Sequence, residues 1–90
     1  MEIKYQICYL DEVVHKHIPA ISSSARVLIK RAIEERLMVD PIGFGKPLRY
    51  SLKGYRRLRV SDYRVVYRIE LKTNTVVIVA IKHRKDVYEV

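Results

Sequence analysis

Arginines alternate with apolar residues in the segment GYRRLRVSDYRVVYRIE, which spans residues 54–70. Successive residues of a strand point to opposite faces of a sheet, so Leu58 and Val60 are predicted to point inward. Arg57 and Arg59 then share the opposite face with Tyr55. Guanidinium groups bind phosphate through planar, paired hydrogen bonds, so this face is suited to contact with a nucleic-acid backbone.

The residues that follow a predicted turn at Ser61 and Asp62 repeat this alternation. The predicted inward face consists of Tyr63, Val65, Tyr67, Ile69 and Leu71. Arg64, Arg68 and Glu70 fall on the other face. A hairpin of these two strands would bring arginines of both strands close together, and clustered arginines repel one another unless they are well hydrated or meet phosphate.

Another basic group stands at the end of the predicted last strand, where Arg84 lies between His83 and Lys85, with Tyr88 four residues later. Strand alternation places Arg84 on one face with Lys82, Ala80 and Ile78. The small Ala80 side chain would leave space for a ligand on this face. A solvated strand end, with Tyr88 packing the tail onto the sheet, is the simpler interpretation of these residues taken alone.

Spacings that would indicate other chemistry are missing from the sequence. His15 and His17 lie two apart in a predicted helix, so they point to different sides and are expected on the surface, with no metal site. The three glycines form no phosphate-binding loop. Cys8 is the only cysteine, which fits a reducing compartment, and its side chain is expected to be buried or half-buried.

Length and net charge limit the number of domains and the kinds of partner. Ninety residues are predicted to form one domain, residues 1–90, with one core. The 18 Lys and Arg against 10 Asp and Glu give a net charge of +8, which favours nucleic acid as a partner. The longest apolar run, residues 76–81, is too short to cross a membrane, and residues 1–10 do not resemble a signal peptide. We therefore expect a cytoplasmic protein without membrane binding.

The elements that must position the basic residues follow from the periodicity of the apolar ones. Residues 2–9 alternate as a strand, and the residues from Leu10 follow helical spacing until Pro19 stops the helix. Three serines at 22–24 offer N-caps for a second helix that ends near Val39. Its predicted apolar stripe consists of Ala25, Leu28, Ile29, Ala32, Ile33 and Leu37.

The second half of the chain is predicted to be strands. Glycines and prolines break regular structure over residues 40–47, followed by a short strand at 48–52 and a turn at Lys53 and Gly54. After the arginine hairpin comes a final strand at 75–83. The predicted fold class is α+β, in the order β-α-α-β-β-β, with an antiparallel sheet and an N-terminal helical hairpin packed on one face. The basic residues would lie on the solvated face.

Three segments resemble the RelE branch of the RelE/ParE toxin superfamily: the loop DPIGFGKPLRYSLKG, the hairpin GYRRLRVSDYRVVY and the ending VVIVAIKHRKDVY. The resemblance covers nearly the whole chain. It implies a small α+β toxin of a type II toxin-antitoxin system, an endoribonuclease that cuts mRNA in the ribosomal A site and is held inactive by a cognate antitoxin. It also implies that no metal or small-molecule cofactor is used.

The resemblance assigns roles residue by residue. Arg64 matches an invariant arginine of the family, Arg84 the arginine that ends the last strand, and Tyr88 the tail aromatic that meets the base or the leaving group. Arg57 occupies a basic position, and His83 resembles the near-terminal histidine of some related toxins. These five are the predicted catalytic residues. The predicted RNA-binding residues are Lys46, Arg49, Lys53, Tyr55, Arg59, Lys82 and Lys85.

Metal-free cleavage of RNA requires the 2′-hydroxyl to attack its own phosphate, while charge is stabilised and protons are moved. Arginine is a poor base but stabilises a charged transition state well. For the proton transfers only His83 and a tyrosine are plausible, and strand alternation turns His83 away from Arg84. The general base is left unassigned.

Two further functions fit the same sequence. A ParE-like inhibitor of DNA gyrase would use this scaffold without being a nuclease, and a basic RNA-binding module without activity would keep the charge pattern. The basic and aromatic set of Arg57, Arg64, Arg84 and Tyr88 favours the nuclease, because a gyrase inhibitor does not need it.

Overall fold

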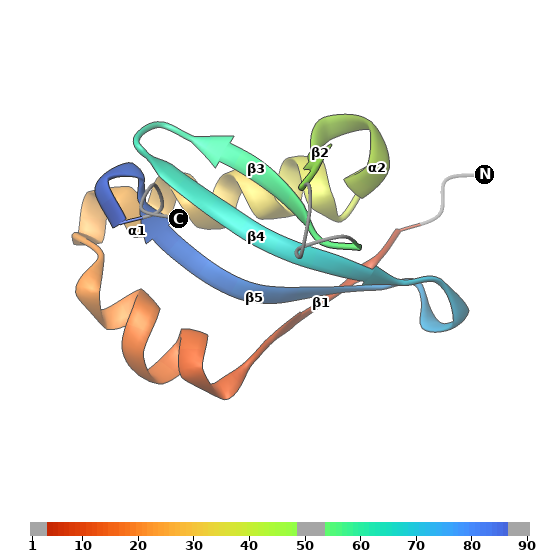
Figure 1. Ribbon diagram of the computed structural model, residues 1–90, viewed down its shortest axis with the longest axis horizontal. Helices are drawn as coiled ribbons and strands as arrows, with labels where there is room; N and C mark the ends of the chain where they lie inside the picture. The colour runs from red at the N-terminus through yellow and green to blue at the C-terminus, as the bar shows by residue number, and fades with distance from the viewer. Residues whose placement is uncertain (1–3, 49–53, 87–90) are drawn as a thin grey trace.

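One sheet and the helices on one of its faces make up the fold (Figure 1). A computed structural model describes residues 4–48 and 54–86. The sheet has five strands, one more than the predicted order β-α-α-β-β-β contains, and they lie in the order β1-β5-β4-β3-β2. Their bounds are β1 (Gln6–Tyr9), β2 (Lys46–Pro47), β3 (Arg56–Val60), β4 (Tyr63–Glu70) and β5 (Thr75–His83). The α+β class and the helices on one face are confirmed.

The sheet is mixed and not purely antiparallel as predicted, because β1 pairs with β5 in the parallel direction. The other neighbouring pairs are antiparallel. The chain leaves β1 through both helical segments before it enters the hairpins, and a crossover of this length allows two strands to run in the same direction.

The helical hairpin consists of residues 11–20 and of α1 (Ser23–Ala32), which continues through the π-helical turn η3 (Ile33–Leu37). The first helical segment is short, as predicted, and ends at Ala20, one residue beyond Pro19, which lies in its last turn, η2 (Ile18–Ala20). Proline is tolerated there because the first residues of a helical turn need no N–H partner. Of the three serines, Ser22 is the N-cap, since its Oγ accepts a hydrogen bond from the Ala25 N–H at 3.3 Å.

The apolar stripe of the second helix forms one side of the core, with Ile29, Ala32, Ile33 and Leu37 buried. Leu28 was predicted in this stripe but is 49% exposed. Each residue of a helix is turned by about 100° from the next, so Leu28 faces away from the line through Ile29 and Ile33.

The predicted inward residues of the hairpin form the other side of the core together with residues of β5, and Leu58, Val65, Tyr67, Val76 and Ile81 are buried there. Leu71 is an exception because it is 68% exposed. The strand β4 ends at Glu70, and Leu71 begins a 3-10 turn, η5 (Leu71–Thr73), where strand alternation no longer applies.

A β-bulge changes the predicted alternation of β5. Val66 of β4 lies opposite Ala80, whereas Tyr67 lies opposite Ile78, so Val79 is an extra residue in β5. Ile78 therefore points into the core, where it is 0% exposed, and does not share a face with Ala80 as predicted. The alternation of the residues after the bulge agrees with the prediction.

The glycine- and proline-rich segment is more regular than predicted. It contains a short helix, α2 (Pro41–Phe44), capped by Asp40, whose Oδ1 accepts a hydrogen bond from the Gly43 N–H at 2.9 Å. The strand β2 follows at once and pairs with β3, whereas the predicted strand at 48–52 lies almost entirely outside the described residues.

Two side chains differ from prediction in their burial. His17 is only 8% exposed, because its ring packs under β5 and Nδ1 accepts a hydrogen bond from the Ile81 N–H at 3.2 Å. Cys8 is exposed, because it lies on the face of β1 that the helices do not cover. No helix in residues 4–48 and 54–86 is long and apolar enough to span a membrane.

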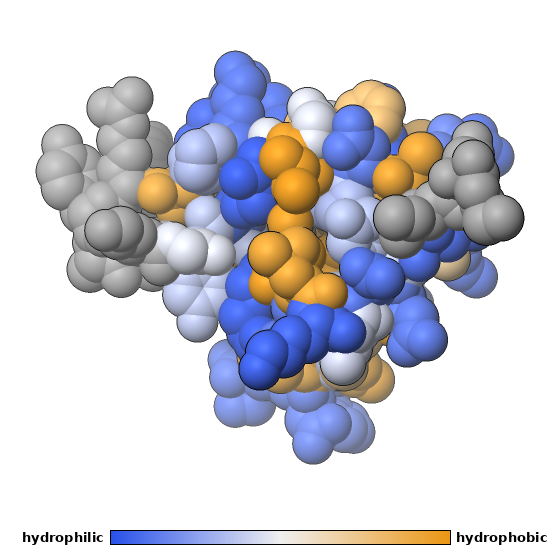
Figure 2. Space-filling view, turned by 90° about the vertical axis from the view of Figure 1, so that its right-hand side faces the viewer, coloured by the Kyte–Doolittle hydropathy of each residue, from blue (hydrophilic) through white to orange (hydrophobic). Residues whose placement is uncertain are grey.

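The end of the molecule that carries α2 and η5 shows a band of hydrophobic surface bordered by hydrophilic residues (Figure 2). The exposed large apolar residues of α2 and η5 are Ile42, Phe44 and Leu71, and Val39 is exposed just before α2. The opposite end, where β5 meets the hairpin turn, carries the basic residues described next.

Candidate nucleic-acid interface

Three cations occupy facing positions on the uncovered side of the sheet. Arg59 of β3 lies opposite Arg64 of β4, which lies opposite Lys82 of β5. We call these three residues the basic row. Like charges that face each other across strands destabilise a sheet. The basic row therefore costs stability in the free protein, and an anion bound over it would relieve the repulsion.

The facing positions next to the basic row carry one arginine and two small apolar side chains. Arg57 lies opposite Val66, which lies opposite Ala80. An open-face groove of about 690 Å³ lies over these positions and is lined by Leu10, Leu48, Tyr55, Arg57, Arg64, Val66, Arg68, Val79 and Ala80. The predicted space beside Ala80 is present, and cations line this groove.

A second hollow, the turn pocket, has a volume of about 360 Å³ and lies where β5 ends beside the β3–β4 turn. Its lining consists of Arg59, Ser61, Asp62, Tyr63, Arg64, Arg84 and Lys85. The Arg84 N–H donates a hydrogen bond to the Asp62 carbonyl oxygen at 2.7 Å, which ties the end of β5 to the turn. This bond brings Arg84 next to two members of the basic row, although 20 residues separate it from Arg64 in the sequence.

His83 lies on the other side of the sheet from the basic row. It faces Tyr63 across β4 and β5, and the two rings meet edge to face with their centres 5.1 Å apart. Its Nδ1 accepts a hydrogen bond from the Lys85 N–H at 3.2 Å, so the neutral ring carries its proton on Nε2. His83 does not line the turn pocket or the open-face groove.

Carboxylates offset little of the charge of this surface. Within residues 4–48 and 54–86, one ion pair joins Arg68 to Glu70, and the Glu12 carboxylate lies 3.6 Å from Nε2 of His17. Arg68, which lies on the basic side of the sheet, is therefore paired with Glu70. Asp62 is the only carboxylate among the residues lining the turn pocket. The same part of the chain holds no cluster of three His, Cys, Asp or Glu side chains that could bind a metal ion.

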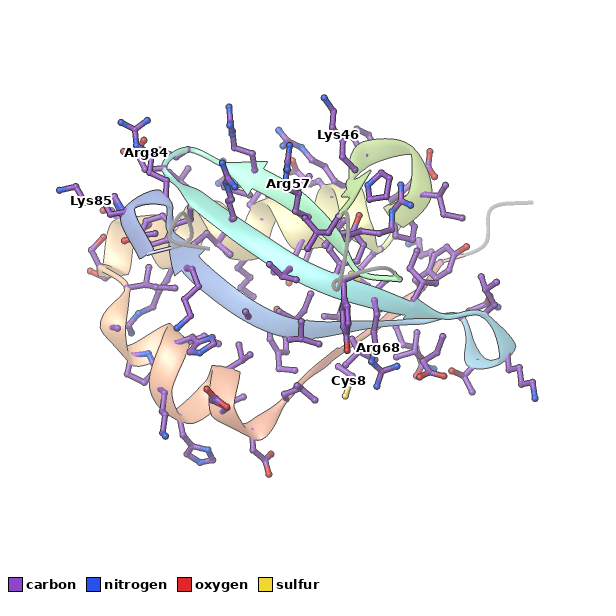
Figure 3. All side chains as sticks on the ribbon, viewed as in Figure 1. Cys8, Lys46, Arg57, Arg68, Arg84 and Lys85 are labelled. Carbon is purple, nitrogen blue, oxygen red and sulfur yellow. The ribbon has the colours of Figure 1, made fainter. Side chains whose placement is uncertain are left out.

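The predicted site residues divide into those that share the basic face, one that faces the other way, and those that lie outside the described residues. Along the sheet, Arg84 and Lys85 lie at one end, Lys46 lies near α2, and Arg57 lies between them (Figure 3). His83 is close in sequence but faces the other way. The structure therefore brings together Lys46, Tyr55, Arg57, Arg59, Arg64, Lys82, Arg84 and Lys85. The predicted residues Arg49, Lys53 and Tyr88 lie outside the described residues.

Sequence reasoning missed one arginine that positions this surface. Arg56 points to the covered side of the sheet, where its Nη2 donates hydrogen bonds to the carbonyl oxygens of Ile42 at 2.7 Å and Gly45 at 3.0 Å. The signal was present, because Arg56 has the same strand parity as Leu58 and Val60. An arginine among inward residues indicates a buried hydrogen-bonding role.

The groups whose pKa is clearly shifted lie outside the basic surface. Burial raises the pKa of Tyr67 and of Tyr9, and the Glu34 carboxylate adds to the effect on Tyr9. Burial lowers the pKa of His17, and Lys82 acts in the same direction while Glu12 opposes it. The Tyr67 hydroxyl donates a hydrogen bond to the Pro41 carbonyl oxygen at 2.6 Å. Tyr9, His17 and Tyr67 therefore contribute to the packing of the fold and not to the basic surface.

Comparison with known proteins identifies the family. The model of the ParE toxin of the type II toxin-antitoxin system parDE matches residues 11–88. The chain therefore belongs to this family of toxins, within the RelE/ParE superfamily. Toxin RelG of Mycobacterium tuberculosis is 45% identical over 49 residues, which cover 54% of this chain and 56% of that protein. The match thus spans about half the length of this relative.

Solved structures agree with this assignment. The RelBE2 toxin-antitoxin complex of Mycobacterium tuberculosis superimposes with a TM-score of 0.85 at 27% identity, covering 93% of this chain and 95% of that one. The archaeal RelE-RelB complex of Pyrococcus horikoshii gives a TM-score of 0.62 at 26% identity, over 93% and 99% of the two chains. The isolated RelE toxin of E. coli shares the fold, with a TM-score of 0.72 at 18% identity over 88% and 83%.

Proposed function

We propose that this protein is a ribosome-dependent endoribonuclease that cuts mRNA in the A site and so inhibits translation in the cytoplasm. The observation that carries this proposal is the basic row of Arg59, Arg64 and Lys82, which lies between two hollows and has no carboxylate ion-pair partner among the described residues. Two of the similar solved structures are complexes of RelE toxins with their antitoxins, which supports the coarser assignment as a toxin of a toxin-antitoxin system.

The reaction that these residues suit is an attack by the RNA on itself. The 2′-hydroxyl loses its proton to water as its oxygen bonds to the adjacent phosphorus. The bond from phosphorus to the 5′-oxygen breaks, and the 5′-oxygen takes up a proton, which leaves a 2′,3′-cyclic phosphate and a 5′-hydroxyl. Extra negative charge develops on the phosphoryl oxygens. Arg64 and Arg84, which line one pocket, would stabilise this charge, a large contribution to catalysis in many enzymes. This route needs no metal ion or small-molecule cofactor.

Positioning of the RNA must come from the ribosome. Arginine is too weak a base to activate the 2′-hydroxyl, and His83 faces away from the basic row. Correct orientation of reacting groups can be worth roughly 7–11 kcal/mol, so a binding site that fixes the RNA would compensate for weak acid–base groups. Free RNA should therefore be cut very slowly.

The direct test is translation of a defined mRNA in vitro with the purified protein, followed by primer extension. New 5′ ends within ribosome-bound codons are expected, and the same mRNA without ribosomes should stay intact. Rapid cutting without ribosomes would contradict ribosome dependence. An intact mRNA in both reactions would contradict nuclease activity.

Inhibition of DNA gyrase is the second candidate, because the matching family model is that of the ParE toxin. A supercoiling assay with purified gyrase separates the two functions. Loss of supercoiling with intact mRNA would support the gyrase inhibitor, and cut mRNA with normal supercoiling would support the nuclease. A protein that binds RNA but does neither would fit the third function, an inactive RNA-binding module.

We also propose a cognate antitoxin as partner, since two of the similar structures are toxin-antitoxin complexes. An antitoxin segment that bears carboxylates or shields the basic row would compete with phosphate for this surface. RNA affinity and hydrogen exchange should be measured on the toxin with and without its antitoxin. The complex should bind RNA far more weakly. Full RNA affinity and full nuclease activity in the complex would show that neutralisation acts elsewhere.

A further inference from the structure

A third hollow, the edge pocket, lies where α2, η3 and β3 meet. Its volume is about 300 Å³, and it is lined by Arg36, Phe44, Lys46, Arg57, Leu58 and Arg59. Four of these six residues are cations and none is acidic. Such a lining attracts anions, and Phe44 adds an aromatic residue that is 51% exposed.

Hydrogen bonds from side chains of the sheet fix the backbone around Phe44, although Phe44 itself is not buried. The Tyr67 hydroxyl and the Arg56 guanidinium donate hydrogen bonds to carbonyl oxygens at both ends of α2. Gly45 packs so closely that a Cβ there would lie 1.7 Å from the Tyr67 hydroxyl oxygen. The backbone around Phe44 is thus held before any ligand arrives, and such preorganisation lowers the entropy lost on binding.

The edge pocket is continuous with the proposed RNA site through shared residues. Arg57 lines both the edge pocket and the open-face groove, and Arg59 lines both the edge pocket and the turn pocket. Lys46 lies opposite Arg57 in the pairing of β2 with β3. A chain of phosphates could therefore pass from the basic row to Phe44 without leaving cationic side chains.

We propose that the edge pocket binds one unpaired RNA nucleotide, with its base stacked on Phe44 and its phosphate held by Arg36, Lys46 and Arg59. An exposed aromatic ring beside cations that follow a backbone is the arrangement of single-stranded nucleic-acid binding sites. The inference rests on the proposed function, because it takes RNA as the ligand. The nucleotide could belong to the mRNA or to ribosomal RNA, and the chemistry of recognition is the same.

The test uses the absence of tryptophan from this chain, which makes an introduced indole the only one. In Phe44→Trp, stacking of a base should quench the fluorescence. Ile42→Trp is the matched control, because Ile42 lies on the same helix, is 54% exposed and does not line the edge pocket. One titration uses a single-stranded RNA of mRNA sequence, and the other uses ribosomes without mRNA. Quenching in the first assigns the site to mRNA, and quenching only in the second assigns it to ribosomal RNA.

RNA affinity is the second measurement. Phe44→Ala should weaken the affinity for the RNA that quenches Phe44→Trp roughly five- to hundredfold, the effect of losing one stacked base. Arg36→Gln should also weaken it, whereas Arg31→Gln, an exposed arginine outside the pocket, should not. No quenching in either titration, equal quenching in the Ile42→Trp control, or quenching by the antitoxin alone would overturn the inference.

The proposed function can fail separately. If Phe44→Trp is quenched by RNA but mRNA stays intact during translation, the nucleotide site stands and the nuclease proposal falls. If mRNA is cut and neither titration quenches the tryptophan, the nuclease proposal stands and the nucleotide site falls.

Discussion

Arg64 occupies the middle of the basic row, with Arg59 on one side and Lys82 on the other. It also lines both the turn pocket and the open-face groove, so it is the residue that the two hollows share. A guanidinium keeps its charge at any physiological pH and can donate two parallel hydrogen bonds to phosphate, which a lysine cannot do. We therefore expect Arg64 to contribute most to any chemistry on this face.

Arg64→Gln should reduce ribosome-dependent mRNA cleavage by roughly a hundredfold or more, the usual effect of removing a charge-stabilising donor. Stability should change little or rise slightly, because the substitution also removes repulsion from Arg59. Primer extension and thermal unfolding measure the two effects. Arg31→Gln on the helical side is the control. Unchanged cleavage by Arg64→Gln, and likewise by Arg84→Ala, would place the active site elsewhere.

His17 predicts a pH dependence of stability. Its Nδ1 must be unprotonated to accept the hydrogen bond from the Ile81 N–H, and burial lowers its pKa below the ordinary value. The unfolded chain therefore binds more protons than the folded one as pH falls below about 6.5, the usual pKa of histidine. The contribution of His17 to stability is complete above that pH and is lost as pH falls through the folded-state pKa.

Urea unfolding at pH 7.5 and pH 5.5 measures this effect. In His17→Gln the difference between the two pH values should shrink, because the titrating group is gone. His15→Gln is the matched control, since His15 is exposed and lies in the same helical segment. An unchanged pH dependence in His17→Gln would mean that His17 does not titrate differently in the folded and unfolded chain.

At the scale of elements, the unit formed by α2 and β2 depends on two side chains that reach it from the sheet. Arg56 of β3 and Tyr67 of β4 donate hydrogen bonds to carbonyl oxygens of residues 41, 42 and 45. Short helices and two-residue strands are too small to be stable alone. The sheet therefore fixes Phe44 and Lys46 through Arg56 and Tyr67.

Tyr67→Phe should destabilise the protein by about 1–3 kcal/mol, because it leaves the buried Pro41 carbonyl oxygen without its partner while the ring still fills the core. The midpoint of urea unfolding measures this change. Tyr63→Phe is the control, since Tyr63 contacts His83 through its ring and its hydroxyl forms no hydrogen bond among the described residues. Equal midpoints for the two variants would show that the bond to Pro41 does not hold α2.

At the scale of the whole molecule, the distribution of charge matters more than its sum of +8. The helices cover one face of the sheet, and cations without carboxylate partners among the described residues gather on the other face. Charge of one sign on one face raises the local concentration of a polyanion and speeds its association. It also makes binding depend on salt.

Binding of single-stranded RNA should weaken with salt, with a slope of log affinity against log salt of about −3.5 if five cations each meet a phosphate. These five are the cations of the open face, Arg57, Arg59, Arg64, Lys82 and Arg84, and a phosphate bound by Arg36 and Lys46 in the edge pocket would steepen the slope further. Fluorescence anisotropy over a range of KCl concentrations measures this slope. Arg59→Gln should make the slope shallower by about 0.7, and Arg31→Gln should leave it unchanged. Identical slopes for the two variants would remove Arg59 from the RNA-binding surface.

Local patterns in the sequence were enough to predict the helical hairpin, the arginine hairpin and the final strand. Alternation separates inward from outward residues without knowledge of the partner strand, and this placed Leu58, Val60 and Val65 in the core. It also placed Arg59, Arg64 and Lys82 on the solvated face. The family resemblance rested on the same residues, and the match over residues 11–88 agrees with it.

Only the tertiary structure decided which of these residues meet. The parallel pairing of β1, the bulge at Val79 and the hydrogen bond from Arg84 to Asp62 are contacts between distant segments, and no local periodicity encodes them. The burial of His17 and the inward role of Arg56 likewise depend on partners far along the chain. Propensity and periodicity specify the face of each element, whereas the partners across the sheet and at its ends follow from how the whole chain packs.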